Sequence, residues 1–70
     1  MGNNPSAEMV LPLTKALLED PDPLVRGHAA WGLAQIGGEA AYQTLKAANE
    51  KELDTYVQKE IETALSVLLD

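Results

Sequence analysis

Residues 20–38 read DPDPLVRGHAAWGLAQIGG, and this stretch decides the fold. Asp22 is placed to cap a helix, and Pro23 suits the first helical position, where a missing N–H costs nothing. Gly37 and Gly38 follow the last apolar residue, and glycine tolerates the left-handed backbone that ends many helices. The stretch therefore predicts one helix from Pro23 to about Ile36.

Apolar residues inside and beyond this helix repeat with the spacing i, i+4, i+8, i+11, which places them on one helix face. The first set is Val25, Ala29, Leu33 and Ile36. The second set is Val57, Ile61, Leu65 and Leu68. Each set predicts a helix with one buried stripe. The small residues Gly27, Ala30 and Ala34 flank the first stripe and predict the close approach of another helix, with the last helix as the candidate.

A shift of 32 residues superimposes one half of the chain on the other. The matched pairs are Leu13 with Leu45, Ala16 with Ala48, Asp22 with Asp54, Val25 with Val57, and Leu33 with Leu65. A period of this length with two helices per unit is typical of helical solenoids. The sequence therefore predicts an all-α fold of two stacked antiparallel helical hairpins, an α-α superhelix.

The remaining three helices follow from the same signals. The first is expected over about 6–19, with Pro12 either kinking it or marking its true first turn. The third is expected from about Glu39 to Asn49, and the fourth runs from the predicted cap Asp54 nearly to Asp70. Residues 1–5 are expected to be disordered or a start left by cloning, and residues 6–70 a single two-repeat domain.

Composition excludes several classes of function. The chain has 70 residues, a net charge of −6 and only five lysines and arginines, so a basic nucleic-acid footprint is absent. It has no cysteine, which excludes a disulfide, a thiolate metal site or an iron–sulfur cluster within these residues. No apolar run approaches the ~18 residues of a membrane span. We expect a cytoplasmic protein with no membrane contact, no metal and no cofactor of its own.

The stretch from Asp20 to Arg26, followed by Ala29-Ala30 and the run Leu33 to Gly37, resembles the HEAT-like repeat also found in phycobilisome lyases. A narrower resemblance runs through residues 24–31, 35–38 and 57–65, which are similar to the C-terminal HEAT-like region of bacterial epoxyqueuosine reductases. The likeness covers about residues 11–68.

The second resemblance implies a role in tRNA modification. Epoxyqueuosine reductases complete queuosine synthesis on tRNA with a cobalamin and two iron–sulfur clusters, and the resemblance places that chemistry in an upstream domain. It implies that the repeat region adds a platform beside the tRNA anticodon arm. The implied partners are the catalytic domain of a parent protein, or another protein, and a weak tRNA contact.

Four residues are candidates for contact with a partner or with tRNA. Arg26 either fastens the turn, with Asp20, Asp22 and Asp54 as the expected acceptors, or contacts phosphate, since its fork of donors suits both tasks.

His28, Trp31 and Gln35 share a helix face turned away from the apolar stripe. Trp31 either covers a neighbouring helix or forms, with the other two, a stacking and hydrogen-bonding patch for a partner or a nucleotide. A single histidine without cysteine does not make an ordinary zinc site.

The sequence shows no nucleophile–base pair, phosphate loop or metal cluster, and we expect no catalysis by this chain. Glu50 and Glu52, near a helix end, are interpreted as surface charge. The preferred function is a non-catalytic binding module from an epoxyqueuosine-reductase-like protein, where it supports anticodon-arm binding or braces the catalytic domain. The alternative is a fragment of a general HEAT-like protein–protein scaffold.

Overall fold

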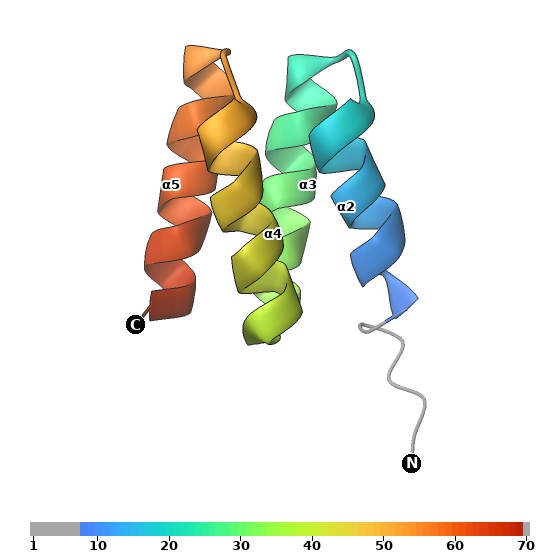
Figure 1. Ribbon diagram of the computed structural model, residues 1–70, viewed down its shortest axis with the longest axis vertical. Coiled ribbons are helices and arrows are strands. Elements are labelled where there is room, and N and C mark those ends of the chain that lie inside the picture. Colours follow the sequence, from blue (N-terminus) through green and yellow to red (C-terminus); the bar gives the residue numbers. More distant parts are fainter. Residues whose placement is uncertain (1–7, 70) are drawn as a thin grey trace.

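The computed structural model describes residues 8–69, and within them it contains four α-helices and no strand (Figure 1). The helices are α2 (Val10–Glu19), α3 (Pro23–Ile36), α4 (Gly38–Lys51) and α5 (Thr55–Leu69). The all-α prediction is therefore confirmed. The predicted start at residues 1–5, and the predicted first turn at Ser6, lie outside the described residues.

The helix bounds follow the predictions closely. The bounds of α3 are those expected, and α5 begins directly after the predicted cap Asp54. Pro12 lies in the first turn of α2, which agrees with the second of its two interpretations. The third helix extends slightly beyond the predicted range, to Gly38 at one end and Lys51 at the other.

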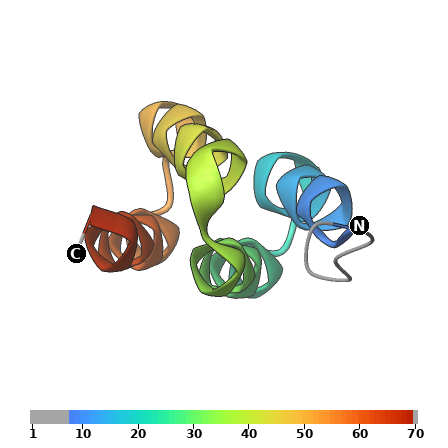
Figure 2. The ribbon, with the colours of Figure 1, turned by 90° about the horizontal axis from the view of Figure 1, so that it is seen from below.

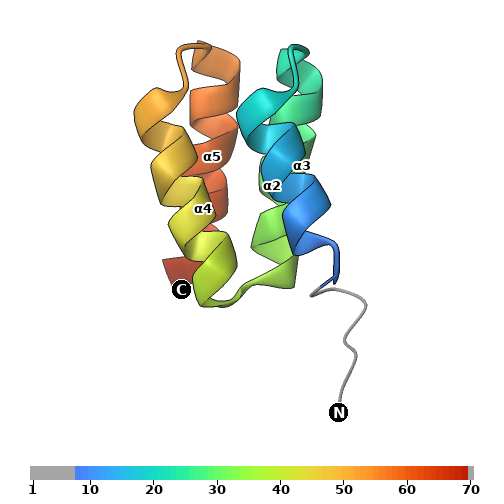
Figure 3. The ribbon, with the colours of Figure 1, turned by 45° about the vertical axis from the view of Figure 1, so that its right-hand side comes forward.

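The helices form two hairpins that stack side by side. Figure 3 shows α2 paired with α3 and α4 paired with α5, with the two short interhelical turns at the same end of the molecule. Viewed along the helices, α2 and α4 lie in one layer while α3 and α5 lie in the other (Figure 2). The predicted pair of stacked antiparallel hairpins is thus confirmed.

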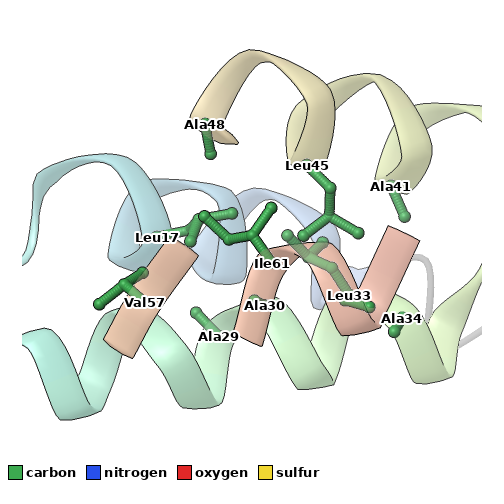
Figure 4. Close-up of a cluster of buried hydrophobic side chains, with 11 residues drawn as sticks. Leu17, Ala29, Ala30, Leu33, Ala34, Ala41, Leu45, Ala48, Val57 and Ile61 are labelled. Carbon is green, nitrogen blue, oxygen red and sulfur yellow. The ribbon is translucent and has the colours of Figure 1, made fainter. Parts of the chain in front are cut away.

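The core lies between the two hairpins and is built from aliphatic side chains of all four helices (Figure 4). Its members are Leu17, Ala29, Ala30, Leu33, Ala34, Ala41, Leu45, Ala48, Val57, Ile61 and Ala64. Many of them are alanines, which lets the helix axes approach closely and leaves the packing to a few larger residues. The largest fully buried side chains are Leu17, Leu33, Leu45, Ile61 and Val57.

Two members of the predicted first stripe, Val25 and Ile36, do not belong to the buried core. Val25 is 37% exposed, whereas its repeat counterpart Val57 is fully buried. The difference has a simple cause. Val57 belongs to the second hairpin and packs against the first, while Val25 occupies the matching position of the first hairpin, at the outer end of the described stack.

In each hairpin one aspartate caps the second helix, as predicted. Asp22 accepts a hydrogen bond from the Leu24 N–H at 2.9 Å. Asp54 accepts from Tyr56 N–H at 2.8 Å and from Val57 N–H at 3.2 Å. Each bond satisfies an N–H that has no partner within its own helix.

Glycine is required at two positions for two different reasons, a positive φ at Gly37 and a close helix contact at Gly27. Gly37 has φ +74°, the left-handed backbone expected between α3 and α4. At Gly27 an added Cβ would lie only 2.9 Å from Cε2 of Tyr56 on α5. The predicted approach of the last helix to this flank of α3 is therefore confirmed.

Candidate functional site

Arg26 lies near the start of α3 and binds to both hairpins. Its Nη1 donates to the backbone carbonyl of Asp20 at 2.8 Å. Its Nε and Nη2 each donate to one carboxylate oxygen of Glu52 at 3.0 Å. This two-point geometry is the strongest arrangement available to an arginine and a carboxylate. The hydrogen bonds that Arg26 donates to the Glu52 carboxylate raise the pKa of Arg26 above its usual range, although desolvation acts in the opposite direction.

Of the three acceptors expected for Arg26, the structure confirms Asp20 alone. Asp20 contributes its carbonyl rather than its carboxylate, and Asp22 and Asp54 serve as helix caps. The actual carboxylate partner is Glu52, whose side chain is only 7% exposed. The interpretation of Glu52 as surface charge was therefore wrong. The missed signal was the 32-residue shift itself, which pairs Glu52 with Asp20.

The interhelical turns of the two hairpins use the same hydrogen bonds. Asp20 Oδ1 accepts from the Asp22 N–H at 2.8 Å, and Glu52 Oε2 accepts from the Asp54 N–H at 3.1 Å. Gln58, the counterpart of Arg26, donates to the carbonyl of Glu52 at 2.6 Å. Arg26 makes the matching bond to the carbonyl of Asp20. In the second hairpin, Gln58 therefore takes the place of Arg26 in the bond to the turn carbonyl.

A shallow groove of about 600 Å³ lies beside these turns. Its charged lining is Glu19, Asp20, Arg26, Lys51, Glu52 and Asp54. Each of the three nitrogens of the Arg26 guanidinium donates a hydrogen bond to an acceptor within the chain. A phosphate entering this groove would meet mainly carboxylates. The geometry supports the turn-fastening interpretation of Arg26 over phosphate contact.

His28, Trp31 and Gln35 all lie on the exposed side of α3. Trp31 is 38% exposed, and its Nε1 donates to Oε1 of Glu60 on α5 at 2.5 Å. The indole therefore spans the two helices of this layer and still presents part of its surface to solvent. The structure is compatible with both interpretations of Trp31, because its indole contacts the neighbouring helix α5 and part of the ring remains accessible to a partner.

Tyr56 extends this surface on α5. It is 42% exposed, and its ring lies against Gly27. Trp31 and Tyr56 are linked through their shared neighbours Glu60 and Gly27, and together with the exposed His28 of α3 we call them the α3/α5 aromatic face. Sequence analysis missed Tyr56, since only the packing of α5 on α3 brings it to this side.

Within residues 8–69, no three histidine, aspartate or glutamate side chains gather in a way that would hold a metal ion. No helix in this range is long and apolar enough to cross a membrane. Among the chemical groups that the structure does bring together are the helix caps, the charged pair Arg26–Glu52 between the hairpins and the α3/α5 aromatic face.

Comparison with known families agrees with this architecture. Residues 1–66 match the family described as HEAT repeats. The chain belongs to the HEAT-repeat family. Its two hairpins are HEAT-like repeats, so the predicted family resemblance is confirmed.

The narrower resemblance is also confirmed. The chain is 41% identical over 56 residues to the epoxyqueuosine reductase of Bacillus subtilis (strain 168), covering 80% of this chain and 14% of that relative. The epoxyqueuosine reductase of Bacillus cereus is 36% identical over 62 residues, which are 89% of this chain and 16% of the relative. The HEAT-repeat chain thus spans about a sixth of the length of these relatives.

Solved structures give the same result. A crystal structure of epoxyqueuosine reductase with an epoxyqueuosine-modified tRNA-Tyr stem loop is similar with a TM-score of 0.85 and 38% identity. That similarity covers 91% of this chain and 17% of the solved one. A selenomethionine-labelled epoxyqueuosine reductase is similar with a TM-score of 0.83 over 89% of this chain.

Proposed function

We propose that this chain is a non-catalytic helical-repeat module of an epoxyqueuosine-reductase-like protein, where it supports binding of the tRNA anticodon arm or braces the catalytic part. The extent of the similarity carries this proposal. Nearly the whole chain corresponds to only 14–17% of each reductase it resembles. A module of this size with an intact pair of hairpins is suited to presenting surfaces.

The α3/α5 aromatic face is the surface that best fits contact with a partner or with tRNA. Trp31 and Tyr56 are 38% and 42% exposed, and aromatic rings with a polar edge are common anchors at interfaces. Such rings also stack on unpaired bases of RNA loops. The contact from Trp31 to Glu60 holds the indole in place before any partner arrives.

Charge limits how much RNA affinity the module can supply alone. Arg26 is engaged within the fold. The other basic residues are Lys15, Lys46, Lys51 and Lys59, which are spread over three helices. Phosphate contacts contribute most of the salt-dependent affinity for nucleic acid, so tRNA binding would depend on a basic surface elsewhere in the reductase-like protein.

A general HEAT-like protein–protein scaffold is the second candidate. The net charge of −6 favours it, because an acidic surface repels RNA but does not hinder binding to a protein. In that case the α3/α5 aromatic face would contact protein only.

A hybrid protein tests the proposal. In the B. subtilis epoxyqueuosine reductase, the segment that matches this chain is replaced by residues 8–69, and binding to an epoxyqueuosine-modified tRNA stem loop is measured by fluorescence anisotropy. We expect the hybrid to bind about as well as the relative itself. Trp31→Ala should weaken binding about tenfold or more if the face contacts RNA. Gln43→Ala, at an exposed position of α4, is the matched control.

The other outcomes separate the alternatives. If Trp31→Ala leaves RNA binding unchanged but lowers the melting temperature of the hybrid more than that of the isolated chain, the module braces the catalytic part. If the hybrid behaves like a variant lacking the segment altogether, the proposed function is wrong and the general scaffold is favoured.

A further inference from the structure

The groove beside the interhelical turns lies between the C-terminal ends of α2 and α4, at the end of the molecule where both turns are found (Figure 1). Its volume of about 600 Å³ is within the roughly 300–1,000 Å³ that is usual for ligand sites. Its lining comes from these two helix ends, from the two turns and from Arg26 of α3. The groove is therefore a surface separate from the α3/α5 aromatic face.

Exposed apolar side chains form part of this groove. Leu53, in the turn between α4 and α5, is 90% exposed, and Leu18 near the end of α2 is 39% exposed. Pro21 of the other turn and the buried Leu17 and Ala48 also line the groove. Single exposed leucines are common on soluble proteins, but here two of them share one concave surface. The groove therefore offers apolar contact area to a bound side chain.

The charged groups of the groove favour a cation. Arg26 and Glu52 form an ion pair and neutralise each other. The remaining charged residues are three carboxylates and one ammonium group, from Glu19, Asp20, Asp54 and Lys51, with a net charge of −2.

Two of these carboxylates have an oxygen to offer. Asp20 and Asp54 accept backbone N–H groups through Oδ1, and among the described residues no hydrogen bond reaches Oδ2 of either. Each carboxylate can therefore accept a further hydrogen bond from a cationic donor without giving up its contact in the turn.

The backbone adds to this preference, because α2 and α4 both present their C-terminal ends to the groove. The last four carbonyl groups of a helix have no partner within it and carry the negative end of the helix dipole. Lys51 lies in the last turn of α4, whereas α2 has no basic residue in its last turn. A lysine or arginine side chain from outside would complement the end of α2.

We propose that this groove is a docking site for a segment of a protein partner in which an arginine or lysine lies next to a large aliphatic residue. The basic side chain binds the carboxylates of Asp20 and Asp54, and the aliphatic residue packs on Leu18 and Leu53. Charge complementarity selects this occupant, because a nucleic acid would bring phosphates to a surface with a net charge of −2. The proposal goes beyond the proposed function and does not depend on it, since the two concern different surfaces.

Two synthetic peptides test the proposal on the intact chain. One contains the run Leu-Arg-Leu-Arg-Leu and the other Leu-Glu-Leu-Glu-Leu, each between glycines and with blocked ends. Each is titrated into the isotope-labelled chain, and binding is followed through the backbone amide chemical shifts. We expect the basic peptide to bind with Kd below about 1 mM and to shift the amides of residues 18–20 and 51–54. The acidic peptide should not bind.

Three results of these titrations would overturn the proposal. The first is the absence of binding by the basic peptide at millimolar concentration. The second is equal binding of the two peptides, because charge would then play no part. The third is a set of shifts confined to the α3/α5 aromatic face, because the peptide would then occupy the other surface.

One pair of substitutions tests the apolar contact. Leu53→Ser should weaken binding of the basic peptide about tenfold, because a leucine that is buried on binding contributes at least this much. Leu11→Ser, at a 78% exposed position of α2 that does not line the groove, is the matched control and should leave binding unchanged. Equal effects of the two would contradict a contact at Leu53.

A second set tests the charges, at exposed positions whose substitution the fold tolerates. Glu19→Gln should weaken binding about two- to fivefold, and Glu50→Gln, which lies outside the groove, should not. Lys51→Gln should strengthen binding, because it removes the ammonium group that repels the peptide. Weaker binding by Lys51→Gln would refute the proposed site. So would displacement of the peptide by a stem-loop RNA, or a dimer of the chain that Leu53→Ser dissociates, because the groove would then hold nucleic acid or a second copy.

Discussion

The guanidinium of Arg26 donates two hydrogen bonds, each 3.0 Å long, to the carboxylate of Glu52. The two residues lie 26 positions apart in the sequence and join the two hairpins. The same Glu52 carboxylate also accepts from the Asp54 N–H at the start of α5. One carboxylate therefore fixes both the relative position of the hairpins and the turn between α4 and α5.

Glu52→Gln should lower the urea midpoint of the chain, because the amide presents only one acceptor oxygen to Arg26 and carries no charge. We expect a loss at least as large as that from removing one helix cap. Glu50→Gln, an exposed position on the preceding turn, is the matched control and should change little. Equal effects of the two substitutions would show that the Arg26–Glu52 contact contributes nothing to stability, as is found for many exposed ion pairs.

Asp22→Ala and Asp54→Ala should each destabilise the chain by about 1 kcal/mol through the loss of an N-cap acceptor. Asp54 accepts two N–H groups and Asp22 one, so Asp54→Ala should be the more costly. Chemical denaturation measures both. Asparagine at either position should restore most of the stability, since it also caps helices well. Unchanged midpoints in both alanine variants would refute the capping account.

Local signals in the sequence were sufficient for the helices and their caps. Asp22-Pro23 and Gly37-Gly38 act within a few residues, so the bounds of α3 follow from the sequence alone. The exposure of Val25 did not follow, because periodicity shows which face is apolar but not whether another hairpin covers it. The carboxylate partner of Arg26 was missed for a related reason: the sequence does not show that the stacking of the two hairpins brings Glu52 to the guanidinium.

Trp31, the only tryptophan, reports on the α3/α5 aromatic face directly. Because it is 38% exposed, its fluorescence should be quenched by acrylamide in the folded chain, and its emission should be only moderately blue-shifted. Trp31→Ala should cost less than the roughly 3–5 kcal/mol of a buried tryptophan. Trp31→Phe keeps a ring and removes the donor to Glu60, so it isolates the hydrogen bond. A strongly blue-shifted, quencher-resistant emission would contradict an accessible face.

The isolated chain should bind an anticodon stem loop only weakly. With Arg26 engaged inside the fold, four lysines remain for phosphate contact. A plot of log K against log salt concentration should therefore have a slope no steeper than about −4. Titration at several salt concentrations gives this slope. Tight binding that persists at high salt would contradict this description of the surface.

The most direct test of the central claim, that this chain is an accessory and not a catalytic part of a reductase-like protein, is the turnover of epoxyqueuosine in tRNA by the B. subtilis hybrid carrying residues 8–69. We predict turnover within a few-fold of the unaltered relative, and a large loss when the segment is deleted. Within the hybrid, Trp31→Ala should change KM for tRNA more than kcat. A folded hybrid that binds tRNA yet has lost turnover would contradict the claim, because residues of this segment would then take part in the reaction itself.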